Sequence, residues 1–305
     1  MRCDNPYVNS SQQAYGCGQC LPCKINKRRE WTHRLMLEAS QWETNVFITL
    51  TYDDEHLPEG GTLVPKHTQD WLRRLRKTTP DKIRFFLVGE YGDKSERPHY
   101  HAIIFNYPCC LRGRTDHVTR MVSGSCCKVC DTVGRTWTFG SVDLGEVNKE
   151  SAGYLCGYTV KKMTAPDDVR LNGRHPEFSR QSNGGGRNGE KLGGIGAGAM
   201  IDVAAEILGS EKIKGPEDVP FNIRQGSENM PIGRYLRGIL KQRLGYAKTQ
   251  SQVEANLQAA KMLPLRMRSR DSTAGFKATL LESTHHVRER IHKREKLFNQ
   301  GKEKV

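Results

Sequence analysis

The sequence contains no long apolar run. None of its stretches approaches the ~18–20 consecutive apolar residues that a membrane-spanning helix needs. Residues 1–6 also lack the apolar segment of a secretory signal peptide. We therefore expect a cytoplasmic protein without a membrane partner, whose ten cysteines stay reduced. Clustered cysteines in such a protein are better explained as metal ligands than as disulfides.

Acidic residues are scarce relative to basic ones. Asp and Glu total 34 against 48 Lys and Arg, which leaves a formal net charge of +14. A surplus of this size favours a polyanionic partner, most simply a nucleic acid. The length of 305 residues is enough for one large domain, or for a domain with an appendage.

Two histidines stand at the start of an apolar, β-branched segment, residues 97–105, which predicts a strand. Side chains two apart on a strand point to the same face, so His99 and His101 can chelate one divalent metal. An apolar run over residues 83–90 and a short polar loop predict a hairpin that brings Glu90 next to His99. Two imidazoles and one carboxylate form a three-ligand site with open positions, as a catalytic metal requires. The alternative is two ordinary strand histidines and a polar strand end.

Cysteines gather in two places. Cys17, Cys20 and Cys23 have the spacing of thiolates that wrap one tetrahedral metal, usually zinc. Lys27 stands where a bacterial ferredoxin motif has its fourth cysteine, so a fourth ligand must come from elsewhere. Cys3 precedes the run.

The second gathering lies in an unusual insert, residues 106–136. Its Cys127-x-x-Cys130 pair is half of a possible structural zinc site, which Cys109 and Cys110 or the N-terminal cysteines complete. A loop of this length rarely orders without such a staple. Plain reduced cysteines are the alternative at both places.

The remaining pattern alternates helices and strands. Residues 24–42 predict an amphipathic helix on which Arg28 and Arg29 can face a phosphate backbone. The further expected elements are a strand at 46–52, a helix at 65–77, a short strand at 137–142 and a helix at 152–163 with Ser151 near its N-cap. Beyond residue 166 we expect mobile glycine-rich stretches and basic helices at 201–208, 235–244 and 277–298.

The helix predicted at 152–163 carries two tyrosines four residues apart. Tyr154 and Tyr158 therefore share one face, and Lys161 lies on that face one turn on. Lys162 adds a second charge. A stripe of core aromatics is the structural alternative, although such a stripe more often continues with Leu or Ile than with Lys.

Three motifs now stand in a fixed order. They are the strand at residues 47–52, Glu90 with the Pro98–His101 segment, and the Tyr154/Tyr158/Lys161 helix. This ordered set resembles the HUH endonucleases that initiate rolling-circle replication, in particular the replication initiators of microvirus-family (gokushovirus-like) single-stranded-DNA phages. The resemblance covers roughly residues 17–162, and the insert at 106–136 departs from it.

The resemblance implies an α+β fold, an antiparallel sheet with helices packed on one face, in a nicking and joining domain over residues 1–165. A Gly-rich linker and a basic helical region would follow at 166–305. The implied reaction is metal-dependent, tyrosine-mediated nicking and rejoining of single-stranded DNA at the viral origin through a 5′-phosphotyrosine intermediate. It would run in the cytoplasm of a bacterial host, with a host helicase and polymerase as partners.

Residue by residue, the resemblance makes Tyr154 and Tyr158 the nucleophiles. Glu90, His99 and His101 would hold Mg²⁺ or Mn²⁺. Lys161 could lower the pKa of the adjacent phenol, so we expect Tyr158 to attack first. Arg28, Arg29 and Lys162 would contact the nucleic acid.

Two other interpretations remain open. An HUH transposase or plasmid relaxase would share the histidines, but many of those use one tyrosine. A non-enzymatic, zinc-stapled nucleic-acid-binding protein would make the histidines structural.

Overall fold

The computed structural model describes residues 3–9, 14–93, 95–112, 126–161, 168–184, 193–210, 215, 219–246 and 275–302. The chain forms two compact units. The sheet unit is Trp31–Val203, and the terminal unit joins Met1–Glu30 to Ala204–Val305.

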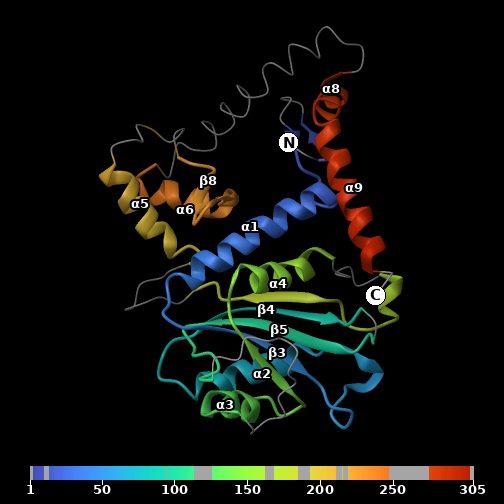
Figure 1. Ribbon diagram of the computed structural model, residues 1–305, viewed down its shortest axis with the longest axis vertical. Coiled ribbons are helices and arrows are strands. Elements are labelled where there is room, and N and C mark those ends of the chain that lie inside the picture. Colours follow the sequence, from blue (N-terminus) through green and yellow to red (C-terminus); the bar gives the residue numbers. More distant parts are fainter. Residues whose placement is uncertain are drawn as a thin grey trace. The chain divides into compact units, whose positions relative to one another are not determined.

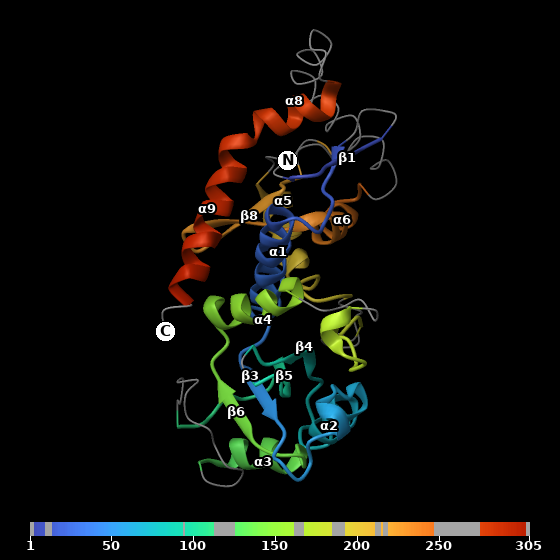
Figure 2. The ribbon, with the colours of Figure 1, turned by 90° about the vertical axis from the view of Figure 1, so that its right-hand side faces the viewer.

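A five-stranded antiparallel sheet organises the sheet unit, in the order β6-β3-β5-β4-β7. The strands are β3 (Asn45–Thr51), β4 (Arg84–Tyr91), β5 (Pro98–Phe105), β6 (Val142–Gly145) and β7 (Phe178–Gln181). The sequence of helix α1 (Leu21–Ala39), β3, helix α2 (Pro65–Arg76) and the β4–β5 hairpin confirms the expected order. Figure 2 shows β6 beside β3.

Helices cover both faces of the sheet, so the expectation of helices on one face is wrong. Helices α2 and α3 (Lys128–Thr136) lie on one face and α4 (Lys149–Lys161) on the other (Figure 1). The reason lies in the central strands: Val46, Ile48 and Leu50 are fully buried on the α2/α3 face, and Phe47 is buried on the other. A strand that is apolar on both sides needs a cover on each.

Helix α4 begins with a reciprocal cap. The Ser151 backbone N–H donates to Asn148 Oδ1 at 2.8 Å, and the Asn148 N–H donates to Ser151 Oγ at 2.9 Å. Asn148 is therefore the cap, three residues before the predicted one, and Ser151 closes the box. On its inner side α4 buries Ala152, Leu155 and Cys156 against β4, β5 and the C-terminal part of α1.

Two predicted elements were misplaced. The insert was expected as a loop, yet it ends in helix α3, whose Val133 and Cys130 are buried in the core. The strand expected at 137–142 starts only at Val142, because Trp137 instead buries its ring and donates Nε1–H to the Thr51 carbonyl at 3.0 Å.

Residues 193–198, expected to be mobile, are anchored in the sheet unit. The buried ion pair Arg84–Glu38, 2.6 Å long, holds the segment: Arg84 donates to the Gly193 carbonyl, and Glu38 accepts the Gly196 N–H at 2.7 Å. Ile195 is fully buried. The sheet likewise continues past residue 165, because β7 pairs with β4. The domain boundaries themselves stay a prediction.

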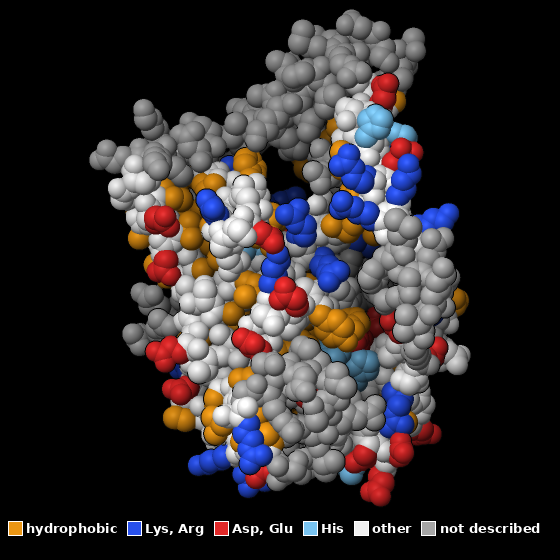
Figure 3. Space-filling model, viewed as in Figure 1, with side chains coloured by type: hydrophobic (Ala, Val, Ile, Leu, Met, Phe, Trp, Pro, Cys, Tyr) orange, Lys and Arg blue, Asp and Glu red, His pale blue; other side chains and the backbone are white. Residues whose placement is uncertain are grey.

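The terminal unit is mostly helical, and its predicted helices are confirmed. It contains β1 (Tyr7–Val8), β2 (Ala14–Tyr15), most of α5 (Ala199–Gly209), β8 (Asn222–Gln225), β9 (Glu228–Pro231), α6 (Gly233–Arg243), α8 (Gly275–Ser283) and α9 (His285–Lys302). Lys and Arg side chains gather along α9 (Figure 3). Among the described residues, no helix is long and apolar enough to cross a membrane.

Candidate metal and nucleophile site

Glu90, His99 and His101 meet on the α4 face of the sheet. Glu90 and His99 are direct partners in the β4–β5 register, and His101 follows two residues on. Oxygen Oε1 of Glu90 lies 2.7 Å from His99 Nε2 and 3.1 Å from His101 Nε2. Glu90 and His101 are buried, while His99 is partly exposed. The structure thus brings together the three side chains that the strand periodicity selected.

The spacing of these three donor atoms fits a six-coordinate cation. Neighbouring ligands of an octahedron with bonds of ~2.1 Å lie ~3 Å apart. The measured separations of 2.7 and 3.1 Å match that edge length. Two imidazole nitrogens and one carboxylate oxygen leave the remaining positions for water or phosphate oxygens.

Each imidazole is held from behind by a further contact. His99 Nδ1 lies 3.1 Å from the Arg97 carbonyl, which can only accept, so Nδ1 carries the proton and donates it. His101 Nδ1 lies 3.0 Å from Thr49 Oγ1, and these two residues are partners in the β3–β5 register. Contacts of this kind fix which ring nitrogen faces a metal.

The carboxylate and its neighbouring imidazole shift each other's pKa in opposite directions. Burial alone would raise the pKa of Glu90, but hydrogen bonds from His101 and His99 outweigh it and lower the value. Burial alone would lower the pKa of His99, and the contact with Glu90 raises it instead. The free site therefore favours an ion pair, in which a bound proton occupies the place of a cation.

Tyr154 and Tyr158 project from α4 onto His101. Their ring centroids lie 5.4 and 5.5 Å from the imidazole centroid and 4.7 Å from each other. Tyr158 stacks on His101, whereas Tyr154 meets it edge-on and stays 48% exposed. Both phenols thus border the same three-ligand group.

Burial raises the pKa of both phenols. The hydrogen bond between the two hydroxyls works against that rise at Tyr154 and adds to it at Tyr158. The negative charge of Glu90 raises both values further. Of the two, Tyr154 is the phenol that ionises more readily. The Lys161 side chain, expected to help Tyr158, lies outside the described residues.

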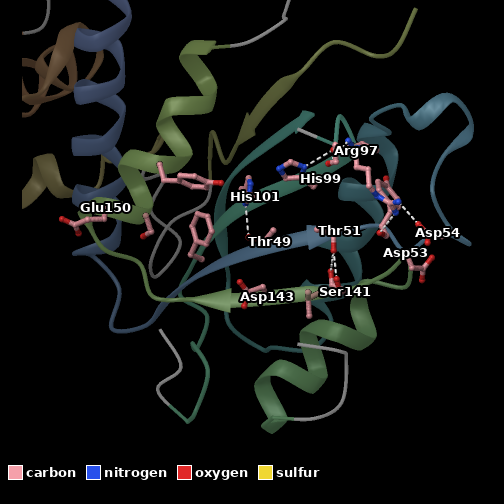
Figure 4. A pocket seen from close by; sticks show the side chains of 17 residues that line it. Thr49, Thr51, Asp53, Asp54, Arg97, His99, His101, Ser141, Asp143 and Glu150 are labelled. Atoms are coloured by element: carbon pink, nitrogen blue, oxygen red, sulfur yellow. Dashed lines mark hydrogen bonds and ion pairs between the residues drawn. The ribbon is translucent and has the colours of Figure 1, made fainter. Parts of the chain in front are cut away.

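A cavity of about 1090 Å³ opens beside this group. Figure 4 shows His101 and His99 on one wall, Thr49 and Thr51 below them, and Ser141 and Asp143 along the β6 edge. Tyr154 also lines it. Sequence reasoning missed the polar residues of β3 and β6. The alternation of β3 was a usable signal, because Thr49 and Thr51 share one face, but their position opposite the histidines depends on a pairing between distant strands.

Residues 45–163 match the family profile of the replication-associated protein ORF2. Replication-associated protein VP4 of Bdellovibrio phage phiMH2K is 35% identical over 162 residues, covering 51% of this chain and 50% of that protein. Replication-associated protein ORF2 of Spiroplasma virus 4 is 34% identical over 177 residues, covering 55% and 54%. Replication-associated protein ORF4 of Chlamydia phage 1 is 28% identical over 162 residues, covering 50% and 39%. The chain thus matches about half the length of these relatives or less. No solved structure matches it.

Residues 45–163 are a replication-associated domain of this ORF2 family. The match runs from β3 to α4 and includes the three-ligand group and both tyrosines. The resemblance to phage replication proteins drawn from the motifs is confirmed.

The cysteines assemble into two groups of four. The first is Cys3, Cys17, Cys20 and Cys23, and the second is Cys110, Cys126, Cys127 and Cys130. Cys3 thus supplies the missing fourth thiol of the first group. Cys109, expected in the second, lies outside it and donates to the Gly145 carbonyl instead, and Cys126 takes its place. Backbone N–H groups of Cys20 and Gln19 lower the pKa of Cys17 to about 6.

The predicted DNA contacts lie outside the matched range or only partly within the described residues. Arg28 and Arg29 are exposed on α1. Lys162 lies outside the described residues. Their contact with nucleic acid stays a prediction.

Proposed function

We propose that this chain initiates rolling-circle replication by nicking and rejoining single-stranded DNA through a phosphotyrosine intermediate. One observation carries the proposal: two phenols border the same imidazole of a three-ligand group, beside an open cavity. A structural role for the histidines would not require two hydroxyl nucleophiles beside them. The named relatives are replication-associated proteins of phages, which supports a role in replication over transposition or plasmid transfer.

In the proposed reaction a tyrosine hydroxyl loses its proton and its oxygen attacks the phosphorus of a DNA phosphodiester. A bond forms between the phenolic oxygen and phosphorus, and the bond to the 3′ oxygen breaks. That oxygen takes up a proton and leaves as a free 3′-OH, which a polymerase can extend. Attack by the 3′-OH on the phosphotyrosine reverses these steps and rejoins the strand.

The site residues have distinct parts in this scheme. Glu90, His99 and His101 would hold Mg²⁺ or Mn²⁺, which would neutralise charge on the scissile phosphate. The Arg97 carbonyl and Thr49 keep the imidazoles aimed at that position. Tyr154, more exposed and with the less raised pKa, would attack first, in place of Tyr158 as the sequence suggested.

The presence of two tyrosines matches the two cleavages of rolling-circle synthesis. The first cleavage leaves one tyrosine bonded to the 5′ end, and the regenerated origin must be cut while that bond persists. A second hydroxyl on the adjacent ring, 4.7 Å away between centroids, can make this cut at the same metal position. A host helicase and polymerase remain the predicted partners.

The decisive experiment uses the full chain with labelled single-stranded oligonucleotides tiled over the genome that encodes it, in Mn²⁺. We expect a protein–DNA adduct that survives denaturing electrophoresis and carries the 5′ side of the cut. The Tyr154→Phe/Tyr158→Phe double variant should form none. Tyr7→Phe, an exposed tyrosine of the terminal unit, is the matched control and should react normally. Sequence-specific binding without any adduct would instead identify a non-enzymatic binding protein.

A further inference from the structure

Two clusters of thiols lie outside the candidate site. In each, four sulfur atoms lie within 4.8 Å of one another. One cluster is Cys3, Cys17, Cys20 and Cys23 in the terminal unit, called here the N-terminal cluster. The other is Cys110, Cys126, Cys127 and Cys130 in the sheet unit, called here the insert cluster. All ten cysteines of the chain are free thiols.

The sulfur separations distinguish a metal site from disulfides. A disulfide needs ~2.05 Å between its sulfurs. Four thiolates bonded to one zinc at ~2.3 Å stand ~3.8 Å apart along each edge of the tetrahedron. Cys3 and Cys20 are 3.8 Å apart, and the pairs Cys110–Cys126 and Cys127–Cys130 are each 3.5 Å apart. Both clusters therefore have nearly the dimensions of a single tetrahedral ion, with no room for a polynuclear iron–sulfur centre.

The backbone of the N-terminal cluster is shaped around sulfur. The N–H groups of Cys17, Cys20 and Asp4 donate to the sulfurs of Cys3, Cys17 and Cys20 at 3.2, 3.3 and 3.3 Å. Such bonds stabilise the thiolate form that a metal needs. The turn depends on two glycines: Gly18 has φ of +77°, and a Cβ on Gly16 would stand 3.1 Å from Cys23 Sγ.

The insert cluster sits at the N-terminus of α3. Cys127 immediately precedes the helix and Cys130 lies in its first turn, so both sulfurs are fixed by one helical start. Cys127 Sγ also accepts the Leu111 N–H at 3.4 Å. Cys110 and Cys126 complete the group from the two ends of the segment that separates β5 from α3.

We propose that each cluster binds one Zn²⁺ as a closed, structural, four-thiolate site. Four thiolates fill the tetrahedron and leave no open position, so neither ion takes part in the reaction proposed above. The proposal stands independently of that reaction.

The N-terminal ion would also fasten the basic helix α9. Asp4, whose N–H bonds the Cys20 sulfur, places its carboxylate 3.5 Å from Arg288 and 3.1 Å from His292. Beside it, Lys277 of α8 donates to Asn5 Oδ1 at 2.8 Å. The N-terminus lies beside these helices in Figure 1. Loss of this ion should therefore free α9, which carries much of the unit's positive charge.

The insert ion would instead hold α3 against the sheet unit. Trp71 of α2 donates its Nε1–H to Thr136 Oγ1 at 3.1 Å, and Arg74 donates to the Thr136 carbonyl at 2.8 Å. The two ions thus have separate mechanical consequences, which allows each cluster to serve as the control for the other.

Metal analysis of the full chain, purified without chelator from zinc-supplemented cells, tests the assignment. We expect about two zinc ions per chain, all released when a mercurial reagent titrates the thiols. Cys20→Ser and Cys130→Ser should each lower the content to about one, and Cys109→Ser should leave it at about two. Release from the unmodified chain keeps the test valid if a serine variant fails to fold.

Hydrogen exchange then tests the link to α9. Exchange in residues 285–302 should rise at least about tenfold in Cys20→Ser and stay unchanged in Cys130→Ser. A chain that folds without zinc, that holds iron instead, or that loses as much zinc in Cys109→Ser would overturn the zinc assignment. Equal exchange of α9 in the two variants would overturn the fastening role.

Discussion

Strand β5 presents two different polar environments on its two faces. On the α2/α3 face, Tyr100 is fully buried, and its hydroxyl bonds Tyr52 at 2.9 Å and accepts the Val64 N–H at 2.8 Å. Tyr52 in turn contacts His67 Nδ1 at 2.9 Å. Every one of these polar groups has a partner inside the protein, as a buried group requires. This network completes the core and has no atom to offer a ligand.

On the α4 face, His99 and His101 also have partners, but the group opens onto a cavity. Its carboxylate and imidazoles are held by one proton-dependent ion pair that a cation can replace. The difference between two adjacent residues, Tyr100 and His101, therefore separates a closed structural network from a ligand site. Strand alternation produces this separation, because one residue step reverses the face.

Exchanging residues on the two faces should give opposite phenotypes, and this is the largest expected effect. His101→Ala removes a metal ligand, so adduct formation should fall more than about 100-fold, beyond the cost of losing a ligand's hydrogen-bond partner. Tyr100→Phe leaves the Tyr52 hydroxyl and the Val64 N–H short of a partner and should lower the free energy of unfolding by about 1–3 kcal/mol. Adduct yield and chemical denaturation measure the two. Equal loss of activity in both variants would show that the faces do not differ as argued.

The paired phenols sharpen the comparison further, because their environments differ although they border one imidazole. Tyr154 is more exposed and has the less raised pKa. We expect Tyr154→Phe to slow the first cleavage at least about tenfold, and Tyr158→Phe to spare it but block release of closed circles. Single-turnover cleavage and circle formation on an origin-bearing strand separate these steps. If Tyr154→Phe both cleaves and terminates at the normal rate, Tyr154 is a packing residue.

Local patterns predicted the part of the site that local geometry determines. A short loop fixes the register of the β4–β5 hairpin, so Glu90 opposite His99 followed from spacing. The tyrosines followed from helical periodicity in the same way. Thr49 did not, because its place behind His101 depends on β3 pairing with a strand about fifty residues away.

The cysteines show the same limit. The Cys17-x-x-Cys20-x-x-Cys23 spacing is local and was recognised, but Cys3 joins it through a fold-back of the chain. Cys109 and Cys126 each stand next to another cysteine, and spacing alone does not say which of two neighbouring thiols turns inward. Only the structure places Cys126 in the cluster and Cys109 against Gly145.

A smaller effect is expected from the support behind His101. Thr49→Val keeps the volume but removes the hydroxyl 3.0 Å from Nδ1, so the affinity for Mn²⁺ should fall about 10–100-fold. Thr51→Val is the matched control: it loses a contact to Ser141 on the same strand and cavity wall but touches neither histidine. Isothermal titration with Mn²⁺ measures both. An unchanged affinity in Thr49→Val would make its contact with His101 incidental.

The smallest effect concerns pH, and its sign follows from the raised pKa of His99. In the metal-free chain, the stability that the His99–Glu90 contact contributes is present below the ordinary His pKa and is lost as pH rises through the raised value. Mn²⁺ has the opposite dependence, because it can bind His99 only after the proton leaves. The rise in Tm caused by saturating Mn²⁺ should therefore be larger at about pH 8.5 than at about pH 6, by a few degrees if the affinity changes about tenfold or more. Differential scanning calorimetry with and without Mn²⁺ measures this, and His99→Gln should remove most of the difference. The same increment at both pH values would mean that no proton competes with the cation, so that the open face of β5 does not bind metal through His99.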